Sequence, residues 1–281
     1  MNGTSPDTHP IERPRLWRLA LQLEPGLLSA VIWSTVEDST LRHFTLPLDP
    51  TLAGHKSLEE AVYAAPVLLS DFGRVDIAVR TPHYLTAPHG LGDDTAGKLL
   101  DYMCLLPEEP HHESRTDSIE SIDTDIIWPV EADTAHFLAR TFRNPRLMSH
   151  MTPLLRYFGS KSRQSNRGKL FAHFTECGGR RQADIIAMTA NGTPSAVSTH
   201  TLSGEDDALY YILLAMQHAG LDRRTDEILL CGHAATRDAV MPRLRRYAAN
   251  VMPVIFPSAA YRAGRDALQA PFPLIILPLC E

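Results

Sequence analysis

Apolar and polar residues alternate at the start of the chain, which is typical of a β-strand with one buried face. Trp or Leu occupies every second position from 17 to 23, and Arg, Ala, Gln and Glu occupy positions 18, 20, 22 and 24. Turn residues at 25–26 and 37–39 separate this segment from two further apolar stretches, 27–34 and 41–46. We predict an antiparallel meander of three strands.

A helix and a fourth strand are expected next. Ser57 and Glu60 have the spacing of a capping box, and apolar residues follow at helical intervals over 58–65. Pro66 is expected to end or kink this helix. The apolar run at 75–80 then predicts a strand.

The pattern is weaker over the next 75 or so residues, where only short elements are predicted. We expect a helix at 96–105, a polar loop at 107–116, a strand at 125–128, and helices at 134–142 and 148–155. Residues 159–168 combine Ser, Gly, Lys and Arg, which predicts an exposed linker. We therefore expect a disordered N-terminus over 1–16, a first lobe over 17–160 and a second lobe over 168–281.

The second half repeats the order of the first. Strands are predicted at 170–175, 183–189 and 195–201, a helix at 208–216, a strand at 227–231, a helix at 243–249 and a strand at 251–256. The helix at 208–216 is apolar on nearly every side, which predicts that it is buried. The repeated order indicates an internal duplication in an α/β protein with mixed sheets.

Composition excludes several classes of protein. The chain has 281 residues and a formal net charge of −6, and no apolar run approaches the roughly 18–20 residues of a membrane span. Residues 1–16 lack the apolar segment of a secretory signal. The four cysteines are widely spaced, which predicts free thiols and a cytoplasmic location. The acidic balance argues against sequence-independent binding of nucleic acid.

Three short segments occur in the order found in one fold family. The first hairpin contains Glu24 and Gly26, the corresponding hairpin of the second half contains Glu176, Gly178 and Gly179 with Asp184 beyond it, and Gly232 and His233 follow a later strand. Together with the duplication, they resemble the ribonuclease-H-like, actin-like fold of actin, sugar kinases, Hsp70 chaperones and pilus-assembly actin homologues. The resemblance implies two lobes with a nucleotide between them. The chain is also similar to a small bacterial family with a domain of unknown function, grouped with the actin-like ATPases.

The hairpins depart from the family pattern at the positions that hold phosphate. The family's Asp is replaced by Glu24 and Glu176, Leu27 stands where a hydroxyl residue is expected, and Pro25 has no N–H to donate. Phosphate sites need several donors and a carboxylate that orients Mg²⁺. These replacements predict that nucleotide binding is impaired.

Three other kinds of site are weaker alternatives. His111, His112 and Glu113 lie in a polar segment without metal-ligand spacing, so we expect no metal site. Cys231 and His233 are poorly spaced for a thiol nucleophile and its base. An arginine-rich segment is expected to be a solvated face or to dock an acidic partner or RNA; its members are Arg223, Arg224, Arg237, Arg243, Arg245 and Arg246.

We therefore expect a catalytically degenerate, actin-like binding or assembly module with no catalytic residues and no cofactor, acting with an unidentified protein partner or as a homodimer. One alternative is an ATPase or kinase-like switch that holds ATP and magnesium between the lobes. Its cofactor-binding residues would be Glu24, Gly26, Glu176, Gly178, Gly179, Asp184, Gly232 and His233. The other alternative is an RNA- or phosphate-binding protein that uses the arginine-rich segment.

Overall fold

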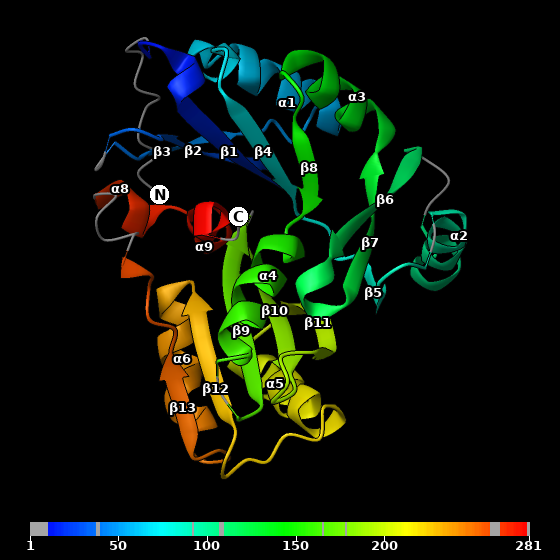
Figure 1. The fold of residues 1–281 in the computed structure, drawn as a ribbon, viewed down its shortest axis with the longest axis vertical. Coiled ribbons are helices and arrows are strands. Elements are labelled where there is room, and N and C mark those ends of the chain that lie inside the picture. The colour runs from blue at the N-terminus through cyan, green and yellow to red at the C-terminus, as the bar shows by residue number, and fades with distance from the viewer. Residues whose placement is uncertain are drawn as a thin grey trace.

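Two five-stranded mixed sheets, one in each half of the chain, organise the fold (Figure 1). The computed structural model describes residues 11–37, 40–91, 93–106, 110–164, 166–177, 179–258 and 265–279. Among these residues, no helix is long and apolar enough to cross a bilayer.

The first lobe contains the sheet β3-β2-β1-β4-β8. Its strands are β1 (Trp17–Glu24), β2 (Leu27–Ser34), β3 (Arg42–Pro47), β4 (Arg74–Val79) and β8 (Arg146–Ser149). Helices α1 (Gly54–Tyr63) and α3 (Ala132–Thr141) cover one face, and short 3-10 turns lie at η1 (Pro14–Leu16) and η2 (Pro66–Leu69). Leu19 and Leu21 of β1 belong to the same buried cluster as Leu58 and Leu138 of these helices.

The second lobe contains the sheet β11-β10-β9-β12-β13. Its strands are β9 (Lys169–Cys177), β10 (Arg180–Met188), β11 (Pro194–Leu202), β12 (Glu227–Gly232) and β13 (Asn250–Pro253), and α5 (Glu205–His218) and α6 (Ala234–Leu244) cover its outer face. In both lobes the first three strands pair antiparallel and the last two add in parallel. The shared order and directions confirm the internal duplication.

A small third sheet is inserted between β4 and α3. It has the antiparallel order β5-β7-β6, with β5 (Leu85–Pro88), β6 (His112–Ile119) and β7 (Thr124–Glu131), and it carries α2 (Asp93–Cys104) and the turn η3 (Glu120–Ile122). The polar loop predicted at 107–116 is therefore wrong from His112 onward. Most side chains of β6 are only partly buried, so the strand lacks a strong apolar pattern.

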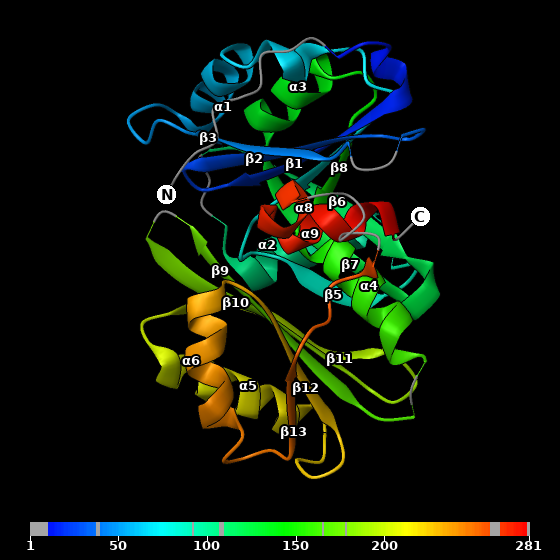
Figure 2. The same cartoon turned by 90° about the vertical axis from the view of Figure 1, so that its left-hand side faces the viewer.

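Helices that precede and follow the strands of the second sheet join the lobes. α4 (Met151–Ser162) belongs to a buried cluster that includes Phe171 and Ile186 of the second sheet as well as the core of the first lobe. The chain returns from β13 to the first lobe, where α8 (Arg265–Gln269), α9 (Phe272–Ile276) and the turn η4 (Leu277–Leu279) lie beside the first sheet (Figure 2). Leu274 packs there with Ala20, so β1 is buried on both faces.

Several predicted helix boundaries are corrected. α1 begins at Gly54, so Ser57 lies inside its first turn, where its N–H donates to the Ala53 carbonyl, rather than at the N-cap. The helix expected at 243–249 is α6, which begins at Ala234 and ends at Leu244. On α5, predicted to be buried on nearly all sides, Tyr210 is 61% exposed.

Two segments expected to be irregular have defined structure. Residues 159–162 continue α4 instead of starting a linker, and Gly159 lies so close to Ile122 that an added Cβ would approach its side chain to 2.6 Å. In the N-terminus expected to be disordered, Ile11 is buried in the core and residues 14–16 form η1; residues 1–10 lie outside the described part of the chain.

Candidate functional site

The carboxyl ends of three neighbouring parallel strands of the first lobe meet the inner face of the second sheet. Glu24 ends β1, Arg80 follows β4 and His150 follows β8. The Arg80 N–H donates to the Leu23 carbonyl and the His150 N–H donates to the Val79 carbonyl, so both residues extend the sheet. Parallel pairing therefore brings three ionisable side chains to one edge.

Asp184 of β10 accepts hydrogen bonds from both lobes. Arg80 donates from Nη1 to Oδ1 at 3.0 Å and from Nη2 to Oδ2 at 2.8 Å. His150 Nε2 lies 3.2 Å from Oδ1, His173 Nδ1 lies 2.9 Å from Oδ2, and the Thr199 hydroxyl donates to Oδ1 at 2.8 Å. The two-pronged arginine contact fixes both the distance and the orientation of the lobes.

Glu24 completes this cluster from the first hairpin. Its Oε1 accepts from Arg80 Nε at 2.9 Å and from Gln22 Nε2 at 2.8 Å. The side chains of Arg80 and Asp184 are only 2% and 0% exposed. We call Glu24, Arg80, His150, His173, Asp184 and Thr199 the interlobe clamp.

The clamp is charged where the protein excludes water. Burial alone would raise the pKa of Asp184, but Arg80 and the two histidines hold it well below its ordinary value. Burial lowers the pKa of Arg80, yet Asp184 and Glu24 outweigh it and raise this pKa. Burial, followed by Arg80, lowers the pKa of His150, so this ring is neutral and donates through Nε2.

The predicted site residues fall into two groups. Glu24 and Asp184 come together through Arg80, whereas Glu176 and His233 form a separate, partly exposed pair with Oε2 and Nε2 3.4 Å apart. The glycines expected at the turns have left-handed backbones, with φ of 80° at Gly26, 73° at Gly179 and 85° at Gly232; Gly178 lies outside the described residues.

The Gly232–His233 turn has a structural explanation. A Cβ on Gly232 would lie 2.0 Å from the Phe174 carbonyl oxygen, so only glycine fits. The His233 N–H donates to that same oxygen at 2.7 Å, and its Nδ1 lies 2.9 Å from the Thr236 hydroxyl. The turn thus joins β12 to β9 and starts α6.

Cys231 and three arginines of the arginine-rich segment are buried or have partners within the protein. Cys231 is buried, and burial raises the pKa of its thiol, so it is protonated and unreactive. In the arginine-rich segment, Arg237 pairs with Asp238 and Arg243 with Asp206. Arg245 donates to the Val251 carbonyl.

A cavity of about 430 Å³ lies in the first lobe, between the first hairpin, α1 and the inserted sheet. Its apolar lining includes Leu23, Leu48, Leu52, Val79, Leu106 and Val130. Ser57 also lines it, is 4% exposed, and has an Oγ without a hydrogen-bond partner among the described residues. We call this space the lobe-I cavity; its described lining comes entirely from the first lobe and the inserted sheet.

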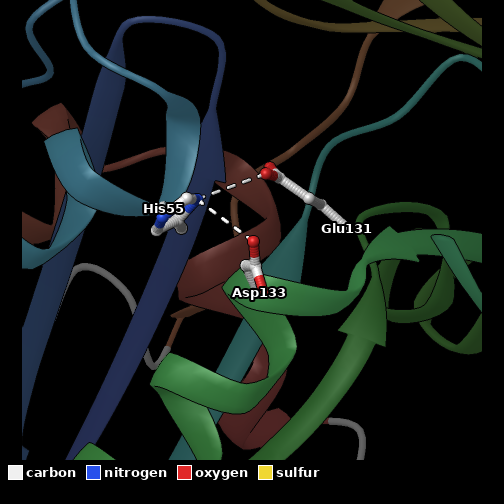
Figure 3. A group of neighbouring side chains, drawn as sticks. All are labelled: His55, Glu131 and Asp133. Atoms are coloured by element: carbon white, nitrogen blue, oxygen red, sulfur yellow. Dashed lines mark hydrogen bonds and ion pairs between the residues drawn. The ribbon is translucent and has the colours of Figure 1, made fainter. Parts of the chain in front are cut away.

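Beside this cavity, His55 points toward Glu131 and Asp133 (Figure 3). Its Nδ1 lies 3.5 Å from Glu131 Oε1 and 3.8 Å from Asp133 Oδ2. The donor set suits a divalent cation, but each carboxylate lies at the first turn of α3, where the helix dipole stabilises a negative charge. Glu131 Oε2 also accepts from the Thr134 hydroxyl, so the group is explained without an ion.

Sequence reasoning missed Arg80, His150 and His173. Arg80 did carry a signal, because it is a charged residue directly after a buried strand. His150 carried none, because its partner Asp184 lies in the other lobe. His173 did carry one, because it stands directly opposite Asp184 in the β9–β10 hairpin, 11 residues away in the sequence.

Comparisons with known proteins agree with this architecture. Residues 8–251 match the family model described as "Protein of unknown function (DUF3822)", and none of the curated proteins matches the sequence. A structure from Bacteroides thetaiotaomicron VPI-5482, described as having an actin-like ATPase fold and unknown function, is 20% identical, with a TM-score of 0.79 over 96% of this chain and 98% of that one.

Two further solved structures are more distant. PilM in the PilM-PilN type IV pilus biogenesis complex is 13% identical, with a TM-score of 0.50 over 95% of this chain and 98% of that chain. Apo ParM of pSK41 is 10% identical, with a TM-score of 0.42 over 90% and 96%. The predicted actin-like fold is thus confirmed, and the chain belongs to the DUF3822 family.

Proposed function

We propose that this protein is a nucleotide-independent binding module on an actin-like fold. The observation that carries the proposal is the buried Arg80–Asp184 ion pair. It links the lobes through side chains, in a fold whose nucleotide-binding members place their ligand between the lobes.

The charge balance of the clamp supports this proposal. A magnesium-nucleotide site needs carboxylates that are free to orient the ion, whereas Glu24 and Asp184 are held by one buried guanidinium. Releasing them would leave Arg80 buried without a counter-charge, at a cost of roughly 3–5 kcal/mol. Pro25 has no backbone N–H, and neither Pro25 nor Leu27 has a side-chain donor. Of these two residues, only Leu27 offers a donor to offset that cost, its backbone N–H.

The lobe-I cavity supports a role in binding. It is mostly apolar, has the size of a small-molecule or side-chain pocket, and contains the unsatisfied Ser57 hydroxyl. PilM, which shares the fold, was solved in a complex with PilN. By this analogy we propose a protein partner that inserts apolar side chains into the cavity. The free thiols of Cys104 and Cys231 fit a cytoplasmic protein.

The direct test is calorimetric titration of the full chain with ATP and Mg²⁺, together with a hydrolysis assay. We expect no binding in the millimolar range and no turnover. Millimolar or tighter binding, with hydrolysis lost in Glu176→Ala and kept in the surface control Glu60→Ala, would contradict the proposal and favour a nucleotide-dependent switch.

A further inference from the structure

A second cavity lies where α4 meets the second sheet, and it shares no lining residue with the clamp or the lobe-I cavity. It has a volume of about 410 Å³ and lies between α4 and the segment that follows β13. Its lining is largely aromatic and aliphatic and includes Phe158, Phe171, Leu229, Val254 and Phe256.

The floor of this cavity is a preformed aromatic surface. Phe158 stacks on Phe171 with ring centroids 3.9 Å apart, and both side chains are buried. Phe256 contacts Phe272 edge-on at 5.4 Å, and Phe272 also stacks on Phe158 at 5.8 Å. Because these rings already hold one another in place, an apolar ligand would not have to order them.

The rim of the cavity carries an excess of positive charge. Lys169 Nζ pairs with Glu227 Oε2 at 3.1 Å. Lys161 Nζ lies 5.8 Å from the centroid of the Tyr157 ring and, within the described part of the chain, pairs with no carboxylate. Among the described residues, two lysines against one glutamate leave one positive charge uncompensated.

Apolar surface next to these lysines is open to water. Ile255 is 83% exposed and Met252 is 38% exposed, and both line the cavity. Covering such side chains with a hydrocarbon chain is favourable, by about 25 cal/mol for each Å² of apolar surface buried.

We propose that this cavity binds a small amphiphile with one negative charge, whose chain lies on the Phe158–Phe171 floor and whose carboxylate pairs with Lys161. The apolar floor selects a hydrocarbon chain or ring, and the single uncompensated charge selects a monoanion over a neutral or cationic ligand. A medium-chain carboxylic acid has this chemistry and a size that suits a pocket of a few hundred Å³.

The test compares two ligands of the same chain length by calorimetry, decanoate and decanol, on the full-length protein. We expect saturable decanoate binding and about fivefold weaker binding of decanol. Lys161→Met is expected to weaken decanoate to the level of decanol and to leave decanol unchanged. Lys56→Met, an exposed lysine on α1, is the matched control and is expected to change neither.

A second variant tests the location. Leu229→Trp fills the cavity and is expected to abolish binding of both ligands, with folding checked by circular dichroism; Lys161→Glu, on the surface, tests the same site if that variant does not fold. The proposal is overturned if decanoate does not saturate below about 1 mM, or if Lys161→Met and Lys161→Glu both bind as wild type. A dimer that dissociates in Ile255→Asp, without decanoate binding, would instead make this face a contact between copies and would also overturn it.

Discussion

Asp184 takes hydrogen bonds from residues of both lobes, at a depth that water does not reach. A buried ion pair of this kind adds little net stability compared with apolar residues of the same volume, because both charges are desolvated. Removing one partner, in contrast, strongly lowers the stability, because the other charge is then buried without compensation. The clamp is therefore better understood as a device that fixes how the lobes meet.

Replacing Arg80 with Met is expected to lower the free energy of unfolding by about 3–5 kcal/mol, because Asp184 and Glu24 lose their counter-charge. Urea unfolding followed by circular dichroism measures the change. The double variant Arg80→Met/Asp184→Leu should recover part of it, since it removes one of the two uncompensated carboxylates. The recovery is incomplete, because Glu24 stays without its counter-charge and His150, His173 and Thr199 lose their acceptor.

Arg140→Met is the matched control for that measurement. The ion pair between Arg140 and Glu59 is exposed, so its loss should cost less than about 1 kcal/mol. Equal effects of Arg80→Met and Arg140→Met would show that the buried pair has no special role.

Among the helices, α9 covers a second face of the first sheet. Its Leu274 and Ile275 pack with Ala20, Val31 and Ala78, which lie on the face of the first sheet opposite α1 and α3. β1 is therefore a central strand with both faces covered, although its sequence alternates like a half-exposed strand.

Leu274→Ala is expected to destabilise the protein by about 2–5 kcal/mol, because it leaves a cavity over the first sheet. Amide hydrogen exchange should also accelerate in β1 and β4, which lie about 250 and about 200 residues away in the sequence. Leu268→Ala, at a half-exposed position of α8, is the control and should have a much smaller effect. Unchanged exchange in β1 would argue against the role given to α9.

The elements predicted well from the sequence are those in which the spacing of apolar residues matches the pattern of buried positions. The hairpins of both lobes have alternating or continuous apolar runs bounded by Gly or Pro. β8 was missed because four residues cannot display a period, and β6 because its side chains are mostly polar. α6 was placed nine residues late, because Pro242 lies inside it and its sequence is only weakly amphipathic.

For the whole molecule, stability is expected to fall in two steps as the pH is lowered. Burial lowers the pKa of His150, so the unfolded chain takes up this proton more readily than the folded one, and stability is lost as the pH falls below about 7. The pKa of Asp184 is also lowered, so its contribution is present above about pH 4 and is lost below it.

Urea unfolding at a series of pH values between about 7.5 and 2 measures both steps. His150→Asn should flatten the decline between about pH 7 and 5 and leave the lower step in place. A variant that keeps the full slope in the upper range would show that another group, such as the partly buried His43 or His200, is responsible.

The candidate site was less predictable than the fold. Glu24 and Asp184 were predicted from their positions in or near the hairpins. Arg80, which joins them, lies in the same lobe as Glu24 and reaches Asp184 across the interface between the lobes. No local pattern encodes which strand ends of one lobe meet which strand face of the other. The contact between the lobes depends on how α4 and α9 pack against the two sheets.

The return of the chain from β13 to the first lobe has a consequence for the two repeats. A single cut in the connection between α4 and β9 would yield an N-terminal fragment without the cover that α9 gives Ala20 and Ala78, and a C-terminal fragment carrying α9 with nothing to pack on. Neither fragment would be a complete lobe. Such fragments could regain the native state only by reassembling with each other, so the unit that was duplicated and the unit that folds are not the same.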